Sequence, residues 1–284
     1  MKLRKETAEI YVWDSVPEDE AIARTTLMGI GCHQDDLEIM AYHGILECFV
    51  TEGAWFAGVT VTNGSGSARD GFYADFTDEQ MMDVRREEQK KAAHLGEYGV
   101  QFLLDYPSSE VKDPENPDPT DDLRDILDAA RPEVVYTHNF ADKHDTHVGV
   151  ASRVIEALRA LDDDAKPARV LGCEVWRDLD WMIDEDKVAL DVAPHESLAM
   201  ALLGVFDSQD CGGKRYDLAS MGRRRAHATY HATHDVDETE GLTFAMDLTP
   251  LIEDESLTIR EHVQTHIDRF ADEVGDRLDR ICGC

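Results

Sequence analysis

Short apolar runs alternate with amphipathic segments along the first 175 residues of the chain. Runs rich in valine, isoleucine, leucine and phenylalanine predict buried β-strands at 25–32, 55–62, 100–104, 133–137 and 170–175. Between them, apolar residues at helical spacing predict helices at 37–50, 78–95, 122–130 and 148–161. Strands that alternate with helices are typical of a parallel sheet covered on both faces. We therefore predict an α/β fold with a three-layer, Rossmann-like, mostly parallel sheet.

The pattern changes after Trp176, where strands and helices no longer alternate regularly. A further strand is expected at 187–192, a helix at 195–206 and a long helix at 259–282. We divide the chain into an N-terminal arm (1–24), an α/β core (25–175) and a C-terminal extension packed on the same domain (176–284).

The charged residues are strongly unbalanced. The 284 residues include 60 acidic and 28 basic side chains, which give a formal net charge of −32. Such a field repels nucleic acid and anionic membranes, so neither is an expected partner. Carboxylate-rich surfaces suit concentrated salt, where screening weakens self-repulsion, and a halophilic source is therefore a hypothesis that unfolding against KCl would test. With no long apolar segment and no signal-peptide pattern, we expect a cytoplasmic protein with reduced cysteines.

The candidate chemistry follows two of the predicted strands. The first strand runs into Cys-His-Gln-Asp-Asp, which places His33, Asp35 and Asp36 directly after it. The fourth strand is followed by a cluster of histidines that includes His144 and His147. The carboxyl ends of parallel strands meet at one edge of a sheet, where α/β proteins bind ligands. Histidines and a carboxylate can hold zinc there, while a second carboxylate accepts a proton from water.

The same segments resemble the PIG-L/LmbE-like family of zinc-dependent N-acetylglucosaminyl deacetylases. Members of this family typically carry His-Pro-Asp-Asp-x-Glu after the first strand and His-Pro-Asp-His after a later one. This chain has CHQDDLEI and DKHDTHVGVA at these places, and VRREEQKKAAHLGE is similar to the family's Arg-x-x-Glu helix ending in Leu-Gly. The resemblance covers about residues 25–160.

The resemblance implies a role for each matching residue. It implies Zn²⁺ ligands at His33, Asp36 and His147. Asp35 would be the general base for the attacking water, and His144 would stabilise the oxyanion or protonate the leaving amine. The implied reaction removes the N-acetyl group from an N-acetylglucosamine-type amino sugar or its conjugate, a small-molecule substrate.

Four further residues are candidates for substrate binding. Arg85 matches the family's substrate-contacting arginine, according to the resemblance. Arg69 follows the glycine- and serine-rich segment after the second strand. Trp176 and Arg177 follow the fifth strand, where an aromatic ring and a cation could hold a sugar. Packing and surface ion pairs are the structural alternatives for these residues.

Two positions depart from the family pattern. Gln34 replaces a proline, which changes the loop but removes no ligand. Thr146 stands where the second motif has an aspartate, a residue that commonly orients a site histidine. Asp142 and Asp145 are the nearby carboxylates that could take this role.

Other interpretations stay open at this point. Asp35 and Asp36 alone could cap a helix, and His138 is expected to be structural rather than a ligand. A metal-dependent phosphoesterase would need ligands for a second metal, for which Asp70 and Asp142 are candidates. A degenerate site would make the chain a non-catalytic sugar-binding module. The basic residues of 214–225 suit an anionic substrate group or a subunit contact. The last helix could pair with a second copy, which would make the protein a homo-oligomer.

Overall fold

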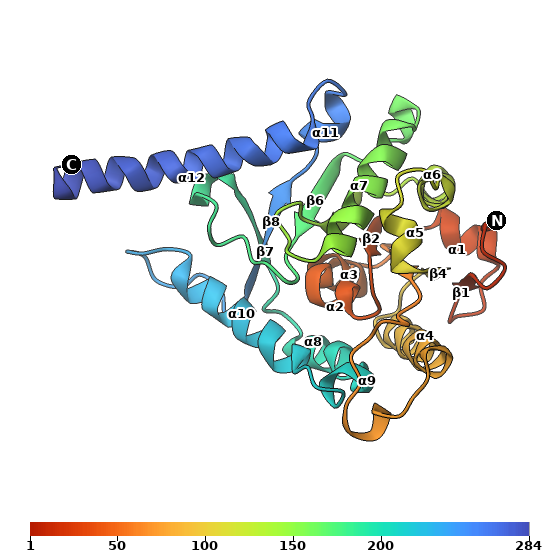
Figure 1. Cartoon of the computed structure of the whole chain (residues 1–284). Helices are drawn as coiled ribbons and strands as arrows, with labels where there is room; N and C mark the ends of the chain where they lie inside the picture. Colours follow the sequence, from red (N-terminus) through yellow and green to blue (C-terminus); the bar gives the residue numbers. More distant parts are fainter. Residues whose placement is uncertain (284) are drawn as a thin grey trace.

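A computed structural model describes residues 1–283, which form one eight-stranded sheet with helices on both faces (Figure 1). The strands lie in the order β1-β4-β3-β2-β5-β6-β8-β7. Neighbours from β4 to β6 are parallel, whereas β1, β8 and β7 pair antiparallel. The predicted mostly parallel α/β sheet is thereby confirmed. The strands are β1 (Glu9–Tyr11), β2 (Leu27–Gly31), β3 (Phe56–Thr62), β4 (Val100–Tyr106), β5 (Val134–His138), β6 (Arg169–Cys173), β7 (Lys187–Asp191) and β8 (Leu242–Asp247).

Two hydrophobic cores lie on the two faces of the sheet. Helices α1, α5, α6, α7 and α11 contribute buried residues to one core, and α2, α3, α4 and α8 contribute to the other. Their bounds, with those of the remaining α-helices, are α1 (Glu18–Ala23), α2 (Asp36–Met40), α3 (Tyr42–Val50), α4 (Asp78–Leu95), α5 (Ser108–Lys112), α6 (Asp118–Ala130), α7 (Asp145–Arg159), α8 (Glu196–Leu203), α9 (Asp207–Asp210), α10 (Tyr216–Tyr230), α11 (Pro250–Glu253) and α12 (Ile259–Cys282). The architecture is therefore three-layered, as predicted.

The order of the parallel strands creates a crevice at the centre of the sheet. β2 has β3 on one side and β5 on the other, so the chain leaves β2 in one direction and later returns on the opposite side. Crevices of this kind, outside the carboxyl ends of the strands, are where doubly wound sheets bind ligands. The two polar segments singled out in the sequence, after β2 and after β5, meet at this point.

One predicted helix is divided in the structure. The segment 37–50 was expected to be continuous, but it divides at Ala41 into α2 and α3. The carbonyls of Glu38 and Ile39, at the end of α2, accept hydrogen bonds from Arg224 at 2.8 and 3.2 Å. The helix divides here because these carbonyls are bound by Arg224. A distant arginine thus binds the end of α2, and α10, which carries it, is held against the central crevice.

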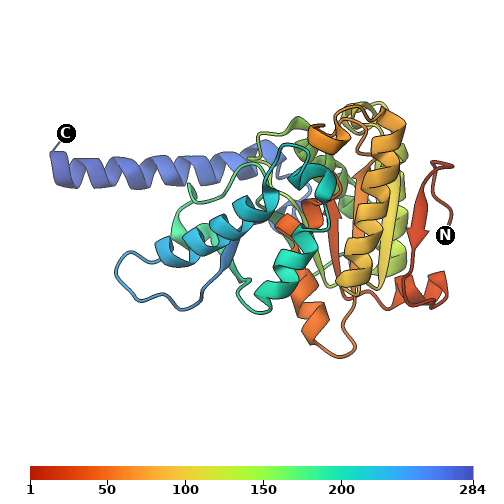
Figure 2. The same ribbon diagram turned by 90° about the horizontal axis from the view of Figure 1, so that it is seen from below.

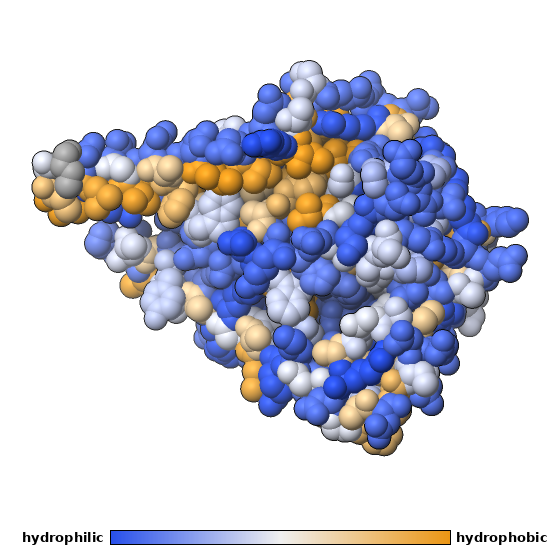
Figure 3. Space-filling view, viewed as in Figure 1, coloured by the Kyte–Doolittle hydropathy of each residue, from blue (hydrophilic) through white to orange (hydrophobic). Residues whose placement is uncertain are grey.

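The last helix, α12, leaves the body of the molecule, as two perpendicular views show (Figures 1 and 2). Its first turns pack on the core through Ile259 and Val263. An apolar stripe continues along its side (Figure 3), where Phe270, Leu278 and Ile281 are exposed. The homo-oligomer stays a prediction. Among residues 1–283, no helix has both the length and the apolar character that crossing a bilayer requires.

Candidate metal centre and active site

Three side chains bring one donor atom each to a single point beyond β2 and β5. His33 Nδ1 lies 3.1 Å from His147 Nε2. Asp36 Oδ2 lies 3.4 Å from His33 Nδ1 and 3.5 Å from His147 Nε2. Ligands that each lie 2.0–2.1 Å from a tetrahedral zinc ion are about 3.3 Å from one another. The observed spacing fits such a site, and it joins the three residues named as ligands from the sequence.

The backbone after β2 places the two neighbouring carboxylates in different surroundings. Asp35 adopts a left-handed conformation with φ of 98°, which is uncommon for a residue other than glycine. The chain then turns into α2, and Asp36 Oδ2 accepts a hydrogen bond of 2.6 Å from the backbone N–H of His33. This bond fixes the Asp36 carboxylate beside the histidines, while the turn directs Asp35 elsewhere.

The cluster favours a positive charge at its centre. Burial acts to raise the pKa of Asp36, but the rings of His147 and His138 outweigh it and hold that pKa well below its usual value. Burial acts to lower the pKa of His147, yet the Asp36 and Asp142 carboxylates raise it. Two ring nitrogens and a carboxylate oxygen this close together repel one another unless a proton or a metal cation lies between them. The donor set and its crowding therefore fit a metal ion.

Two further side chains lie against the cluster. Cys32 Sγ is close enough to the other donors to be a fourth. Burial raises the pKa of its thiol well above the usual value, so it would bind as a thiolate only where a cation compensates the charge. His138 Nε2 accepts a hydrogen bond of 2.9 Å from the Cys32 backbone, which occupies the nitrogen that faces Asp36. The His138 ring stacks on His147 with centres 3.9 Å apart. This is the structural role expected for His138. Cys32 was not among the donors predicted from the sequence.

Asp142 lies behind the cluster, on the outer side of His147. Its Oδ2 is 3.6 Å from His147 Nδ1, a contact rather than a hydrogen bond. The carboxylate also accepts backbone N–H bonds from His144 at 2.8 Å and Trp176 at 3.0 Å. Asp145, the other carboxylate considered in place of Thr146, is exposed at the start of α7. Asp142 is therefore the acid placed to orient a site histidine.

Asp35 lies next to the cluster and is held by Arg85. The Arg85 guanidinium is 3.1 Å from Asp35 Oδ2, and it also donates to the carbonyl of Gln34. Burial raises the pKa of Asp35 to about 7, although Arg85 acts in the opposite direction. A carboxylate of this kind can accept and release a proton near neutral pH. Arg85 is 1% exposed, and its contacts with the Asp35 loop are shorter than its contacts with Glu88 and Ser208, at 3.6 and 3.5 Å.

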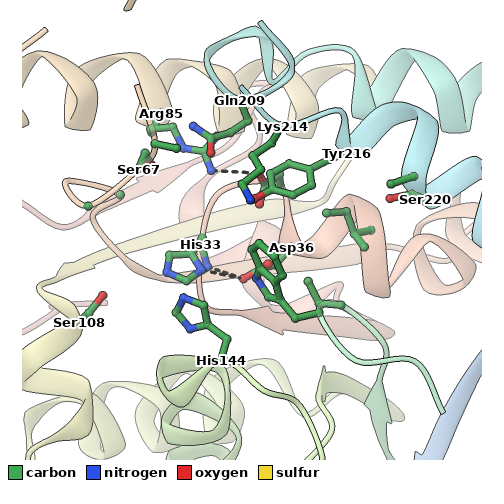
Figure 4. A pocket seen from close by; sticks show the side chains of 18 of the residues that line it. His33, Asp36, Ser67, Arg85, Ser108, His144, Gln209, Lys214, Tyr216 and Ser220 are labelled. Carbon is green, nitrogen blue, oxygen red and sulfur yellow. Dashed lines mark hydrogen bonds and ion pairs between the residues drawn. The ribbon is translucent and has the colours of Figure 1, made fainter. Parts of the chain in front are cut away.

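A pocket of about 480 Å³ opens over these residues (Figure 4). We call its metal side, with His33, Asp36 and His144, the inner wall. The opposite side, which we call the outer wall, is formed by residues 209–223 of the C-terminal extension, including Gln209 and Lys214. The loop 64–68 and Trp176 complete the lining.

The His144 ring connects the cluster to the rest of the pocket. It stacks on His147 with ring centres 4.5 Å apart and faces the Trp176 ring at 6.3 Å. Burial lowers the pKa of His144, and the neighbouring rings of His147 and His33 add to this effect. The imidazole is therefore neutral at neutral pH.

The proposed substrate contacts differ in their placement. Trp176 and Arg85 line the pocket, whereas Arg69 and Arg177 do not belong to its lining among the described residues 1–283. Arg69 donates to the Ser65 carbonyl at 2.7 Å and pairs with Asp78, which ties the 64–68 loop to α4. Arg177 is exposed. The sequence had marked the outer wall only through its run of basic residues.

Part of the chain matches the model of a known protein family. Residues 28–158 match the model of the PIG-L family, which is described as GlcNAc-PI de-N-acetylase. Over these residues, which we call the PIG-L region, the chain is similar to the PIG-L family. The PIG-L region runs from β2 into α7 and contains the three clustered donors, while the outer wall lies beyond it. No curated protein sequence matches the chain.

Solved structures share the fold at low sequence identity. The 4-carboxy-2-hydroxymuconate hydratase GalB from Pseudomonas putida has a TM-score of 0.57 at 17% identity, over 79% of this chain and 95% of its own. The N,N'-diacetylchitobiose deacetylase from Pyrococcus horikoshii has a TM-score of 0.57 at 17% identity, over 78% and 84%. A deacetylase of teicoplanin biosynthesis has 0.56 at 16%, over 78% and 98%. Because one of these is a hydratase, the activity of the PIG-L region has to be argued from its site.

Proposed function

We propose that the protein is a zinc-dependent hydrolase that removes the N-acetyl group from an N-acetylglucosamine-type amino sugar or conjugate. The observation that carries this proposal is the spacing of 3.1–3.5 Å among the donor atoms of His33, Asp36 and His147, with Asp35 beside them. The family description as a de-N-acetylase and the deacetylases among the similar structures support amide hydrolysis.

The residues present are suited to zinc. His33, Asp36 and His147 would hold it, and two nitrogens with one carboxylate oxygen are a common ligand set in catalytic zinc sites. When bound, zinc supplies a Lewis acid that polarises the acetamide carbonyl and acidifies a water molecule. Asp142 would orient the His147 ring from behind, as carboxylates outside the ligand set commonly do.

Asp35 would carry the proton through the reaction. It accepts a proton from the attacking water and returns it to the nitrogen of the departing amino sugar, and a group whose pKa is about 7 can do both. Arg85 holds one carboxylate oxygen and so fixes the direction of the other. His144, being neutral, would donate a hydrogen bond to the developing oxyanion. The products are acetate and a free amine.

Metal analysis and acetate release together test the proposal. We expect one zinc ion per chain and acetate release from a panel of N-acetylglucosamine conjugates. Asp35→Asn should retain zinc but lower kcat by about 10²–10⁴-fold, because the base is lost. Asparagine tolerates the left-handed backbone found at Asp35, so the loop should keep its shape. A zinc-loaded wild type that is as inert as Asp35→Asn would refute the enzyme and favour a sugar-binding module.

The phosphoesterase alternative requires a second metal. Among the described residues, a single group of donors is close enough to hold an ion. Asp70 caps Gly71 at the surface, and Asp142 is bound to backbone N–H groups, so neither extends that group. Two metal ions per chain, with phosphate release from a phosphoester, would favour this alternative.

A further inference from the structure

The outer wall of the pocket comes from a part of the chain that the family match does not include. Residues 209–223 follow α8 and form the turn between α9 and α10 as well as the first half of α10. Gln209, Lys214, Tyr216, Ser220 and Arg223 from this segment line the pocket. In the close view, Gln209 and Lys214 lie across the cavity from His33 and His144 (Figure 4).

The charge of the pocket is opposite to that of the molecule. Acidic residues are 60 of 284 in the chain, yet among the described residues only Asp35 and Asp36 line the pocket as acids. Both of them belong to the inner wall, where the proposed metal and Arg85 compensate them. The outer wall contains Lys214 and Arg223 and no carboxylate. A net charge of −32 repels anions from the surface in general, so this wall is a local reversal.

The basic residues of the outer wall differ from their neighbours in sequence, because the neighbours form ion pairs and, in the described part of the chain, they do not. Arg215 and Arg225 form surface ion pairs with Asp217 and Glu196. Within residues 1–283, neither Lys214 nor Arg223 has an acidic side chain within ion-pair distance. The outer wall therefore holds two cations without counterions.

Both of these cations lie against Trp176 and its neighbour. Lys214 Nζ lies 5.0 Å from the centre of the Trp176 ring, and Arg223 donates to the carbonyl of Val175 at 2.6 Å. These contacts leave the positive charges without an anion. They also place the cations beside an aromatic surface that a sugar ring could cover.

An unused hydrogen-bond donor points to the same place. Gln209 is 5% exposed, and its Nε2 has no hydrogen-bond partner. A buried donor left without an acceptor costs roughly 1–3 kcal/mol, so native structures seldom keep one unless a ligand or water completes it. Gln209 lines the pocket, and an oxygen of a bound molecule would satisfy it.

We propose that the outer wall binds an anionic group, a phosphate or a carboxylate, carried by the substituent of the amino sugar. This inference rests on the proposed function for the sugar and its acetyl group. Lys214 and Gln209 would contact the anionic oxygens, and Arg223 would add charge. The Trp176 ring lies near both sites, 6.3 Å from the His144 ring and 5.0 Å from Lys214 Nζ. It offers a face on which the sugar ring can lie.

Three substrates that differ only in the substituent test the proposal. These are methyl N-acetylglucosaminide, N-acetylglucosamine 1-phosphate and the carboxymethyl glycoside of N-acetylglucosamine. We expect kcat/KM of the zinc-loaded enzyme to be at least about tenfold higher for one of the anions than for the neutral glycoside. The preferred anion identifies a phosphate or a carboxylate. Lys214→Gln should lower this preference about tenfold, and Lys214→Arg should keep most of it.

The control is Lys91→Gln, which removes the same charge from an exposed position on α4 outside the pocket and should leave the preference unchanged. The inference is wrong if the wild type prefers the neutral glycoside or if Lys214→Gln leaves the preference intact. If no substrate releases acetate, the proposed function fails, and the anion site is then judged by calorimetry. Glucosamine 1-phosphate should still bind more tightly to the wild type than to Lys214→Gln, and equal affinities would reject the site.

Discussion

The two walls of the pocket differ in how firmly their side chains are held. On the inner wall, Asp36 is 2% exposed and bound to the backbone of His33, and Arg85 holds Asp35. On the outer wall, Lys214 is exposed and its ammonium lies 5.0 Å from the centre of the Trp176 ring. Catalytic groups need a fixed geometry, whereas a charged contact to a substituent tolerates movement. Under the proposals made above, the inner wall would carry out the reaction and the outer wall would select the substituent of the substrate.

The largest expected effect comes from removing the charge of the inner wall. Asp36→Asn preserves the shape of the side chain but loses the carboxylate that lies 3.5 Å from His147 Nε2. We expect zinc content to fall below about a tenth of the wild type, and kcat/KM to fall at least about 10³-fold. Lys214→Gln is the control from the outer wall, and its zinc content should remain full. Full zinc content in Asp36→Asn would mean that the inner wall is not the metal site.

Arg224 connects the helices that carry the two walls, because it lies on α10 and donates hydrogen bonds to carbonyls at the end of α2. Replacing it should break this connection. This arginine is 4% exposed, and burial lowers its pKa to about 10. Arg224→Met would leave the carbonyls of Glu38 and Ile39 without their donor, and should lower the free energy of unfolding by about 2–4 kcal/mol. Urea unfolding measures this loss. Arg225→Met removes an exposed neighbour and should change stability by less than about 0.5 kcal/mol, so equal losses would contradict the role of Arg224.

A pH effect of intermediate size should come from Glu38, which is buried under the inner wall. Its Oε1 accepts hydrogen bonds from Tyr98 at 2.7 Å and Gln89 at 2.9 Å, and burial raises its pKa from 4.5 to about 7. Between these values the folded chain keeps a proton that the unfolded chain releases, so this contribution to stability disappears as pH rises.

Glu38→Gln is neutral at every pH and should not show this loss. In metal-free protein we expect the stability of the variant relative to wild type to increase by about 2–3 kcal/mol between pH 4.5 and pH 8. Urea unfolding at both pH values measures it. Glu47→Gln, at an exposed position of α3, should show no such difference. A parallel pH dependence of wild type and Glu38→Gln would show that Glu38 is ionised in the folded protein.

The smallest effect should come from Asp142, the carboxylate behind the proposed metal ligand His147. Asp142→Asn weakens the contact behind His147, and we expect zinc affinity to fall about 10–100-fold with the fold intact. Competition with a chelator of known affinity measures the change. Asp145→Asn alters the exposed acid three residues later and should have no effect. A loss in Asp145→Asn but not in Asp142→Asn would reverse the assignment made for the residue that compensates Thr146.

The sequence predicted that the residues of the inner wall would lie together, whereas their roles follow from the family resemblance and stay predictions. His33 and Asp36 follow one strand and His147 follows another, and parallel strands of a doubly wound sheet bring such positions together. The partner of Arg85 was not predictable, because the contact with Asp35 depends on how α4 packs against the loop after β2. The outer wall could not be predicted for a related reason. Whether Gln209 and Lys214 reach the pocket depends on how residues 209–223 fold back, and no periodicity encodes that path.

The binding of Arg224 to the end of α2 has a consequence for how this protein can evolve. Arg224 donates to main-chain carbonyls, which every amino acid provides. Substitutions at positions 38 and 39 therefore leave the hydrogen bonds of Arg224 in place. If Arg224 is replaced, a new side chain at those positions does not restore them. Paired substitutions in related sequences would give no sign of this contact. The site edge and the extension can thus diverge independently while one arginine keeps them together.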